Sequence, residues 1–471
     1  MLLPWRGREA KEFPVILDLL ELAAGVDVPL EVVAYLEGSA VSFPCEVKKT
    51  TERAFVVMCA LDQVAMHIHP SVKSKIPGRS SSTRGMLTAM RTDRTISGFY
   101  AEIAGSGYVI PKGRLMPGLD RANGDEQSGA SLAHQFSFLS FLPLQPNLTL
   151  RPKAFPPNRM TVTDGAAQRV GLAPIAEDHD DLAFSVSERN KRPFLDTAPV
   201  AAKLEERIRE TVISMLGEGA GLIVLPELVT SRRAVDDLSE TLRRSPMPQS
   251  AVILVGSGPS VEKDTTLDRP YNEAVILSAT GEELFRQRKL NPFNMNWRRM
   301  QDCQLERAAG HEEHFHMEDC AMGDELVICD IHGLGRMVVL ICEDLEQQAP
   351  GGDVCLHALP DWILTPVLDI ALDFGRWEHR RAMEVSRKTL SRVVVSCSAS
   401  LQVRALGKEK LAEAGKVCTG LCLDGLNSLR VKQISVGGKS SGQRSVVEWK
   451  SDTWKEHRIV PKRARRKPKG A

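Results

Sequence analysis

The stretch Met337-Val338-Val339-Leu340-Ile341-Cys342-Glu343-Asp344-Leu345 joins an apolar run to a cysteine and two acidic residues. An apolar, β-branched run of this length, starting after Gly335, predicts a buried strand that ends at Cys342. The end of a core strand is where the loops and pockets of an α/β protein meet, and it is a common position for a nucleophile. A lone cysteine is more often an inert core residue, so this interpretation needs support from other segments.

Glu227 and Lys289 occupy equivalent positions in two further apolar segments. Within the apolar segment 221–228 the predicted strand stops at Pro226, which has no amide hydrogen for a sheet ladder. Glu227 is therefore expected at a strand end, in apolar surroundings that raise a carboxylate's pKa. Residues 271–277 and 283–290 flank a glycine turn and predict a hairpin that delivers Lys289. Taken alone, the glutamate would be a helix N-terminal acid and the lysine a solvated side chain.

Together the three segments resemble the carbon–nitrogen hydrolase superfamily, also called the nitrilase superfamily, whose mark is a Glu–Lys–Cys triad on three strand ends. The matching residues are Glu227 in Leu-Pro-Glu, Lys289 in Arg-Lys-Leu and Cys342 in Ile-Cys-Glu-Asp, at successive spacings of 62 and 53 residues. Each motif is weak alone, but three in the right order, each closing an apolar strand, are fairly specific. The resemblance begins near residue 168 and does not cover the N-terminal part of the chain.

The segments around the triad alternate between helical and strand patterns. Leu204, Ile208, Val212 and Leu216 recur every four residues and predict a helix over 198–217. A second helix over 232–244 and a strand over 251–256 repeat the unit, which predicts an α/β fold. The resemblance implies the four-layer α-β-β-α sandwich of the nitrilase type, preceded by a smaller domain of unknown fold.

Five prolines between residues 143 and 157 predict an extended linker between two domains. The predicted organisation is an N-terminal region over 1–142, a proline-rich linker over 143–160, a hydrolase-like domain over 161–455 and a basic tail over 456–471.

Within the N-terminal region the sequence predicts local structure but no recognisable fold. Residues 12–38 have a helical pattern, and 54–69 reads as a strand that would place His67 and His69 on one face. A metal site would need a third ligand, and none stands out, so no metal is expected. A role in binding partners or in regulation is the remaining interpretation of this region.

The composition excludes several classes of protein. The chain has 471 residues, a net charge of +1 and ten cysteines at no disulfide-like spacing, which fits a reducing cytoplasm. No run reaches the length of a membrane span, and the first residues lack a signal-peptide pattern, so no membrane association is expected. The balanced charge argues against a nucleic-acid partner, with the basic tail at 462–469 as the one segment that could contact one; its ordinary interpretation is a solvated tail.

The resemblance also implies roles for individual residues. Glu227 would take the thiol proton of Cys342, and Lys289, with the backbone N–H of Glu343, would hold the oxyanion. The superfamily often carries a second glutamate in the segment 291–323, before a glycine such as Gly323; Glu313 is the candidate, with Glu312 as the alternative. The superfamily uses no cofactor, and its members usually form homo-oligomers.

Two classes of function remain. Glu343-Asp344 after the cysteine resembles the amidase and glutaminase branches, which favours a small-molecule amide over a nitrile as the substrate of a cysteine hydrolase. The alternative is a non-enzymatic or signal-processing nitrilase-like module of a larger assembly, because such domains occur fused to unrelated partners, including components of bacterial defence systems. Faster labelling of Cys342 by iodoacetamide than of the other nine cysteines would favour the enzyme.

Overall fold

The computed structural model describes residues 11–22, 31–32, 35, 47–66, 107–111, 136, 139–143, 145–155, 159–245, 250–305, 316–370, 372–414, 416–424, 430–437, 443–450 and 453–459. By their internal contacts the residues divide into two units. The first contains Met1–Thr161, Ile328–Met337 and Asp353–Asp361, and the second contains Val162–Val327, Val338–Gly352 and Trp362–Ala471.

The second unit contains a sheet with the strand order β10-β9-β8-β7-β4-β19-β20. Its strands are β4 (Arg169–Leu172), β7 (Leu222–Val224), β8 (Val252–Lys263), β9 (Pro270–Ser278), β10 (Glu283–Arg288), β19 (Arg444–Lys450) and β20 (Thr453–Ile459). The helices α7 (Ala201–Gly217) and α8 (Arg232–Arg244) cover one face, because Ile208, Val212 and Leu238 are buried in one apolar cluster with Ile223 and Ile253. A short helix, α6 (Asp164–Ala167), precedes β4.

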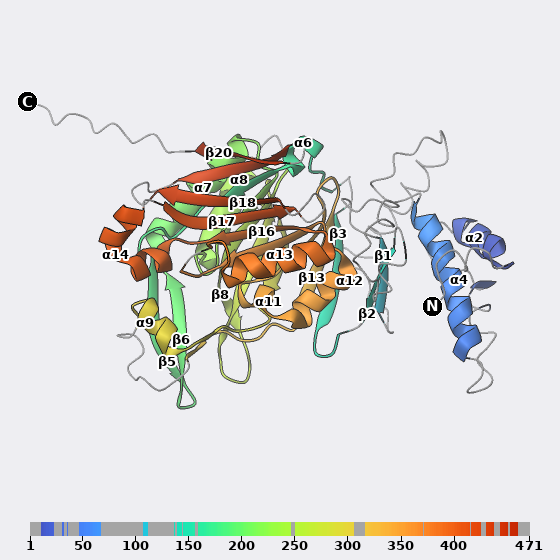
Figure 1. The fold of residues 1–471 in the computed structure, drawn as a ribbon, viewed down its shortest axis with the longest axis horizontal. Coiled ribbons are helices and arrows are strands. Elements are labelled where there is room, and N and C mark those ends of the chain that lie inside the picture. Colours follow the sequence, from blue (N-terminus) through green and yellow to red (C-terminus); the bar gives the residue numbers. More distant parts are fainter. Residues whose placement is uncertain are drawn as a thin grey trace, which may run out of the picture. The chain divides into compact units, whose positions relative to one another are not determined.

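A second sheet of this unit has the order β18-β17-β16-β15-β14. Its strands are β14 (Gly335–Val339), which begins in the first unit, β15 (Trp362–Val367), β16 (Arg392–Cys397), β17 (Lys416–Asp424) and β18 (Arg430–Gly437). Its helices are α11 (Glu343–Glu346), α13 (Trp377–Thr389) and α14 (Ser400–Ala414), with a turn of π-helix at Gln348–Gly352. Figure 1 shows α13 lying in front of β16.

The two sheets pack face to face. A Cβ atom on Gly420 of β17 would lie 3.2 Å from Leu172 Cδ1 of β4, so only glycine allows this close approach without displacing the leucine. With α7 and α8 outside one sheet and α13 outside the other, the layers run α-β-β-α. The sandwich expected from the sequence is therefore confirmed.

A smaller sheet, with the order β11-β12-β6-β5, includes two strands from the segment that links Lys289 to the cysteine strand. Its strands are β5 (Leu182–Arg189), β6 (Arg192–Pro199), β11 (Asn294–Met295) and β12 (His316–Glu318), and α9 (Trp297–Asp302) follows β11. Because β12 pairs with β6 in parallel, Glu318 is held opposite Leu195.

The first unit contains α2 (Phe13–Leu22), α4 (Val47–Met66), β1 (Gly107–Pro111), β2 (Leu139–Pro143), β3 (Thr149–Phe155), β13 (Glu325–Ile331) and α12 (Asp353–Ala358), although β13 begins in the second. The strand predicted over 54–69 is wrong, because residues 54–66 belong to α4. Val56, Val57 and Ala60 pack with residues of α2 in one apolar cluster, and this helical spacing outweighs the β-branched composition. His67 and His69 lie outside the described residues.

The segment 143–160, expected as an extended linker, contains β3, which follows β13 in the strand order β14-β13-β3. Leu150, Ala154 and Phe155 of this strand are buried. The four-part division of the chain stays a prediction, and the basic tail at 462–469 lies outside the described residues.

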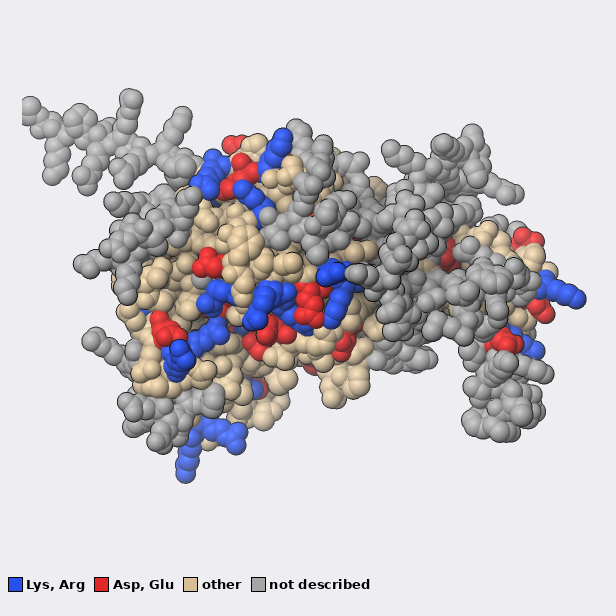
Figure 2. Space-filling model, viewed as in Figure 1, with Lys and Arg blue, Asp and Glu red and all other residues tan. Residues whose placement is uncertain are grey.

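The face of the second unit that carries α13 mixes charges of both signs (Figure 2). Glu384 pairs with Arg381 at 2.7 Å and with Lys388 at 2.5 Å, as expected for a solvated helix face. Among the described helices, none combines the length and the apolar composition that crossing a bilayer requires.

Candidate active site

Glu227 lies just beyond β7, at the position predicted for it. Its side chain is 1% exposed, and Oε1 accepts hydrogen bonds from Asn272 Nδ2 at 2.9 Å and from Lys289 Nζ at 2.8 Å. Oε2 accepts one from the backbone N–H of Leu368, which follows β15, at 2.9 Å. Burial raises the pKa of Glu227, although Lys289 and a hydrogen bond with Cys342 lower it. A carboxyl group whose pKa is raised in this way is a stronger base than a solvated carboxylate.

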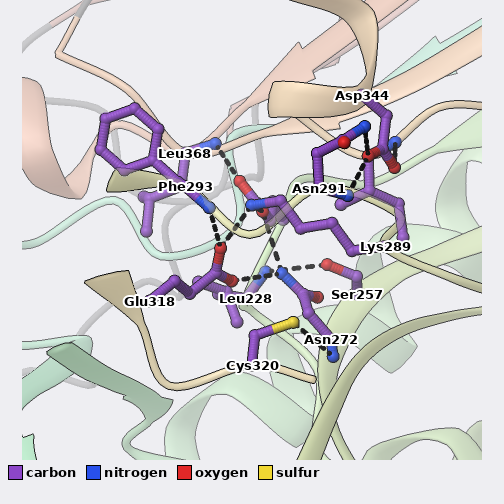
Figure 3. Close-up of polar contacts among 12 residues, drawn as sticks. Leu228, Ser257, Asn272, Lys289, Asn291, Phe293, Glu318, Cys320, Asp344 and Leu368 are labelled. Atoms are coloured by element: carbon purple, nitrogen blue, oxygen red, sulfur yellow. Dashed lines mark hydrogen bonds and ion pairs between the residues drawn. The ribbon is translucent and has the colours of Figure 1, made fainter. Parts of the chain in front are cut away.

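Lys289 follows β10 and lies between two carboxylates (Figure 3). Its Nζ is 2.8 Å from Glu227 Oε1 and 2.6 Å from Glu318 Oε2, and the residue is 1% exposed. Burial lowers the pKa of Lys289, but the two carboxylates raise it by more, so the resulting pKa lies well above the ordinary value of a lysine. The ammonium group is therefore a fixed positive charge in a site of low polarity.

Cys342 stands between β14 and α11, with a backbone φ of 49° that side-chain-bearing residues rarely adopt. Its N–H donates to Pro366 O at 3.0 Å, and the residue is 5% exposed. Burial, followed by the charge of Glu227, raises the pKa of the Cys342 thiol, so the resting group is protonated. Glu343 is the first residue of α11, and the first amides of a helix have no intrahelical acceptor.

Asp344, the second acid after the cysteine, ties the lysine segment to the cysteine segment. Its carboxylate accepts hydrogen bonds from the backbone N–H groups of Leu290 at 3.0 Å, Asn291 at 2.7 Å and Ile341 at 3.1 Å. Burial raises the pKa of Asp344 to about 7, although these donors lower it. Because it links residues on either side of the pocket, Asp344 is a positioning residue.

We expect Asp344→Asn to lower both stability and turnover. Either carboxylate oxygen faces at least two N–H donors, so the new amide NH₂ group must face donors. Leaving such a buried group unsatisfied costs about 1–3 kcal/mol in the free energy of unfolding. Urea denaturation and steady-state kinetics measure the two effects. Asp324→Asn, at an exposed position, is the control, and wild-type behaviour of Asp344→Asn would contradict the positioning role.

Glu318 is the second glutamate at this site. Its Oε2 accepts hydrogen bonds from Lys289 Nζ at 2.6 Å and from Phe293 N at 3.1 Å, and its Oε1 accepts one from Asn272 Nδ2 at 2.9 Å. The predicted candidate Glu313 and its alternative Glu312 lie outside the described residues. Glu318 precedes Gly323, as expected, but its position at the end of a three-residue strand gave no readable signal in the sequence.

Glu227, Lys289, Glu318 and Cys342 line one pocket of about 490 Å³, part of which is open to solvent. The other lining residues include Arg299, Asp369 and the apolar side chains of Phe184, Leu195, Phe293, Met295, Leu368 and Leu401. In the part of the chain that the structure describes, no group of three or more His, Cys, Asp and Glu side chains is arranged to hold a metal ion.

Residues 189–348 match the sequence model of the carbon-nitrogen hydrolase family. A comparison with curated protein sequences gave no match. Among solved structures, Saccharomyces cerevisiae Nit3, a member of branch 10 of the nitrilase superfamily, is similar at 12% identity, with 62% of this chain and 90% of that chain covered and a TM-score of 0.34. An amidase from Nesterenkonia sp. is similar at 14% identity, over 61% of this chain and 92% of that chain, with a TM-score of 0.37.

The glutamine-dependent NAD+ synthetase from Acinetobacter baumannii is similar at 14% identity and a TM-score of 0.39, over 62% of this chain and 48% of the synthetase, so the chain spans about half of that protein's length. The family match contains the three strand-end residues Glu227, Lys289 and Cys342. On this match, residues 189–348 of the chain resemble the carbon-nitrogen hydrolase family.

Proposed function

We propose that the protein hydrolyses a non-peptide carbon–nitrogen bond through Cys342, Glu227 and Lys289, with a cysteine thioester as the intermediate. The observation that carries the proposal is the pair of ion contacts that places the Lys289 ammonium between Glu227 and Glu318 in the pocket of Cys342. A buried acid, a buried cation and a thiol in one pocket are the groups that acyl transfer requires.

In the first half of the reaction Glu227 accepts the thiol proton, and the Cys342 sulfur attacks the carbonyl carbon. A carbon–sulfur bond forms, and the carbonyl oxygen becomes an oxyanion. Lys289 and the backbone N–H of Glu343 stabilise this charge in a site from which water is largely excluded. Glu227 then passes its proton to the leaving nitrogen, the carbon–nitrogen bond breaks, and ammonia or an amine departs.

In the second half a water molecule attacks the thioester and gives a proton to Glu227. The carbon–sulfur bond breaks, a carboxylic acid is released, and the proton returns to the Cys342 sulfur. Glu318, rather than Glu313, is the second glutamate in this proposal, because it shares both Lys289 and Asn272 with Glu227. It would orient the water and hold Lys289 in place.

The sequence Glu343-Asp344 after the nucleophile resembles the amidase branch, so the proposed substrate is an amide rather than a nitrile. The test is ammonia release from a panel of short amides and nitriles, with mass spectrometry of the intact protein to detect an acyl adduct on Cys342. Failure of every compound to give ammonia or an adduct would instead favour the non-enzymatic module. The same panel decides between amide and nitrile.

The pH dependence of kcat/KM should report the environment of Glu227. The base must be ionised, so activity falls as the pH falls through the pKa of Glu227, which burial raises above the ordinary 4.5. Asn272→Leu removes a donor to Oε1 and should move this acid limb to higher pH. Asn294→Leu, at an exposed position on β11, should not move it. An acid limb at or below 4.5 would contradict this role for Glu227.

We also propose that residues 161–455 form the hydrolase domain and that the chain assembles into homo-oligomers, as the superfamily resemblance suggests. Light scattering after size-exclusion chromatography measures the oligomeric state.

A further inference from the structure

The guanidinium group of Arg299 lies in the wall of the pocket that contains Cys342. Its helix, α9, begins after Asn296, whose side chain accepts a hydrogen bond from Arg299 N at 2.9 Å. The Arg299 side chain is 28% exposed, and its Cζ lies 4.9 Å from the centre of the Phe293 ring. In the described part of the chain, the guanidinium donates to Asp369 through Nη2, and no hydrogen bond from Nη1 or Nε is found. These N–H groups remain available to a ligand.

Asp369 does not compete for the ligand, because its carboxylate is buried and already saturated. It is 2% exposed. Oδ2 accepts from Arg299 and from Trp377 Nε1 at 2.8 Å, and Oδ1 accepts from Ile370 N at 2.6 Å and from Arg376 Nη2 at 3.3 Å. The accessible charged group on this wall is therefore the guanidinium, and the aspartate fixes its direction.

The charges around Asp369 leave this wall positive. Arg299 and Arg376 contribute two cations, and Asp369 contributes one anion. The fourth group, Glu378, is fully buried, and burial together with the neighbouring Asp369 raises its pKa to about 9, so it is protonated at neutral pH. The net charge of this cluster is therefore positive, because its two cations outnumber its one anion, Asp369.

The rest of the wall is apolar, with Leu195, Met295 and Leu401 among its residues. Arg299 and Cys342 line the same pocket, so a small molecule bound there can contact both groups. A planar guanidinium binds a carboxylate through two parallel hydrogen bonds.

We propose that the substrate carries an anionic group, a carboxylate in the simplest case, a few bonds from the scissile amide, and that Arg299 binds this group. That the substrate is an amide rests on the proposed function. That it carries an anionic group rests on the geometry of the pocket wall. Arg299 is thus a specificity-determining residue.

The kinetic test compares succinamate with butyramide, which has a methyl group where succinamate has its carboxylate. A charge-assisted hydrogen bond typically contributes roughly 10- to 100-fold, so the wild-type kcat/KM should be at least tenfold higher for succinamate. Arg299→Met should reduce kcat/KM for succinamate at least tenfold more than for butyramide, mainly through KM, and Arg299→Lys should retain part of the preference. Arg298→Met removes the same charge from an exposed neighbour and should leave the preference unchanged.

A binding experiment separates this inference from the proposed function. Calorimetry with the Cys342→Ala protein should detect succinamate and glutarate, with binding at least tenfold weaker in Cys342→Ala/Arg299→Met. If no amide is hydrolysed but this binding is observed, the hydrolase proposal fails and the anion site stands. If butyramide is hydrolysed as well as succinamate, or if Arg299→Met weakens both substrates equally, the anion site is overturned and Arg299 only supports Asp369.

Discussion

Cys342→Ala is expected to abolish hydrolysis while the protein remains folded. The substitution removes the sulfur of the proposed nucleophile, and loss of the nucleophile of a hydrolase typically lowers kcat by roughly 10⁴-fold or more. The side chain lies at a pocket wall, so the free energy of unfolding should change by about 1 kcal/mol. Ammonia release and urea denaturation measure the two quantities, and mass spectrometry should show no acyl adduct.

Cys422→Ala is the matched control for this substitution. Cys422 is a fully buried cysteine on β17, opposite Val394, and it does not line the pocket. Its removal should affect stability but not the acyl adduct. Wild-type turnover in Cys342→Ala would exclude Cys342 as the nucleophile.

Lys289→Ala should reduce both turnover and stability. Losing a donor that stabilises an oxyanion raises the reaction barrier by about 3–4 kcal/mol. The substitution also leaves Glu227 and Glu318 without the cation that lies 2.8 Å and 2.6 Å from them. Breaking a buried ion pair by removing one partner costs about 3–5 kcal/mol. Because Lys289 lowers the pKa of Glu227, the acid limb of any residual activity should move to higher pH.

Lys263→Ala provides the control for the loss of a lysine. Its Nζ lies 2.9 Å from Asp268 Oδ2, but its side chain is 46% exposed, and such pairs contribute little to stability. Unfolding curves and kinetics should therefore match the wild type. If Lys289→Ala were as stable and as active as Lys263→Ala, Lys289 would be neither a buried counter-ion nor an oxyanion donor.

Local patterns predicted most elements of the hydrolase fold because each pattern reflects burial within a single segment. The helix predicted over 232–244 is α8, whose Leu238 and Leu242 are buried and whose first turn is capped by Ser231. The prediction failed over 54–69, where the β-branched residues that suggest a strand pack as one face of α4. Packing against α2 decided between the two conformations, and this contact cannot be read from a single segment.

The chain by itself predicted where Glu227, Lys289 and Cys342 stand, because Glu227 and Cys342 end apolar runs and Lys289 ends the return strand of a hairpin with a visible glycine turn. Only the tertiary structure decided which side chains surround them. Glu318 reaches Lys289 from a strand of three residues, and Asp344 joins two segments through backbone N–H groups. Arg299 and Asp369 meet from elements 70 residues apart. Such contacts form only when distant segments fold against one another. The periodicity of a sequence shows which face of a single segment is buried, but not which distant side chains that face will meet.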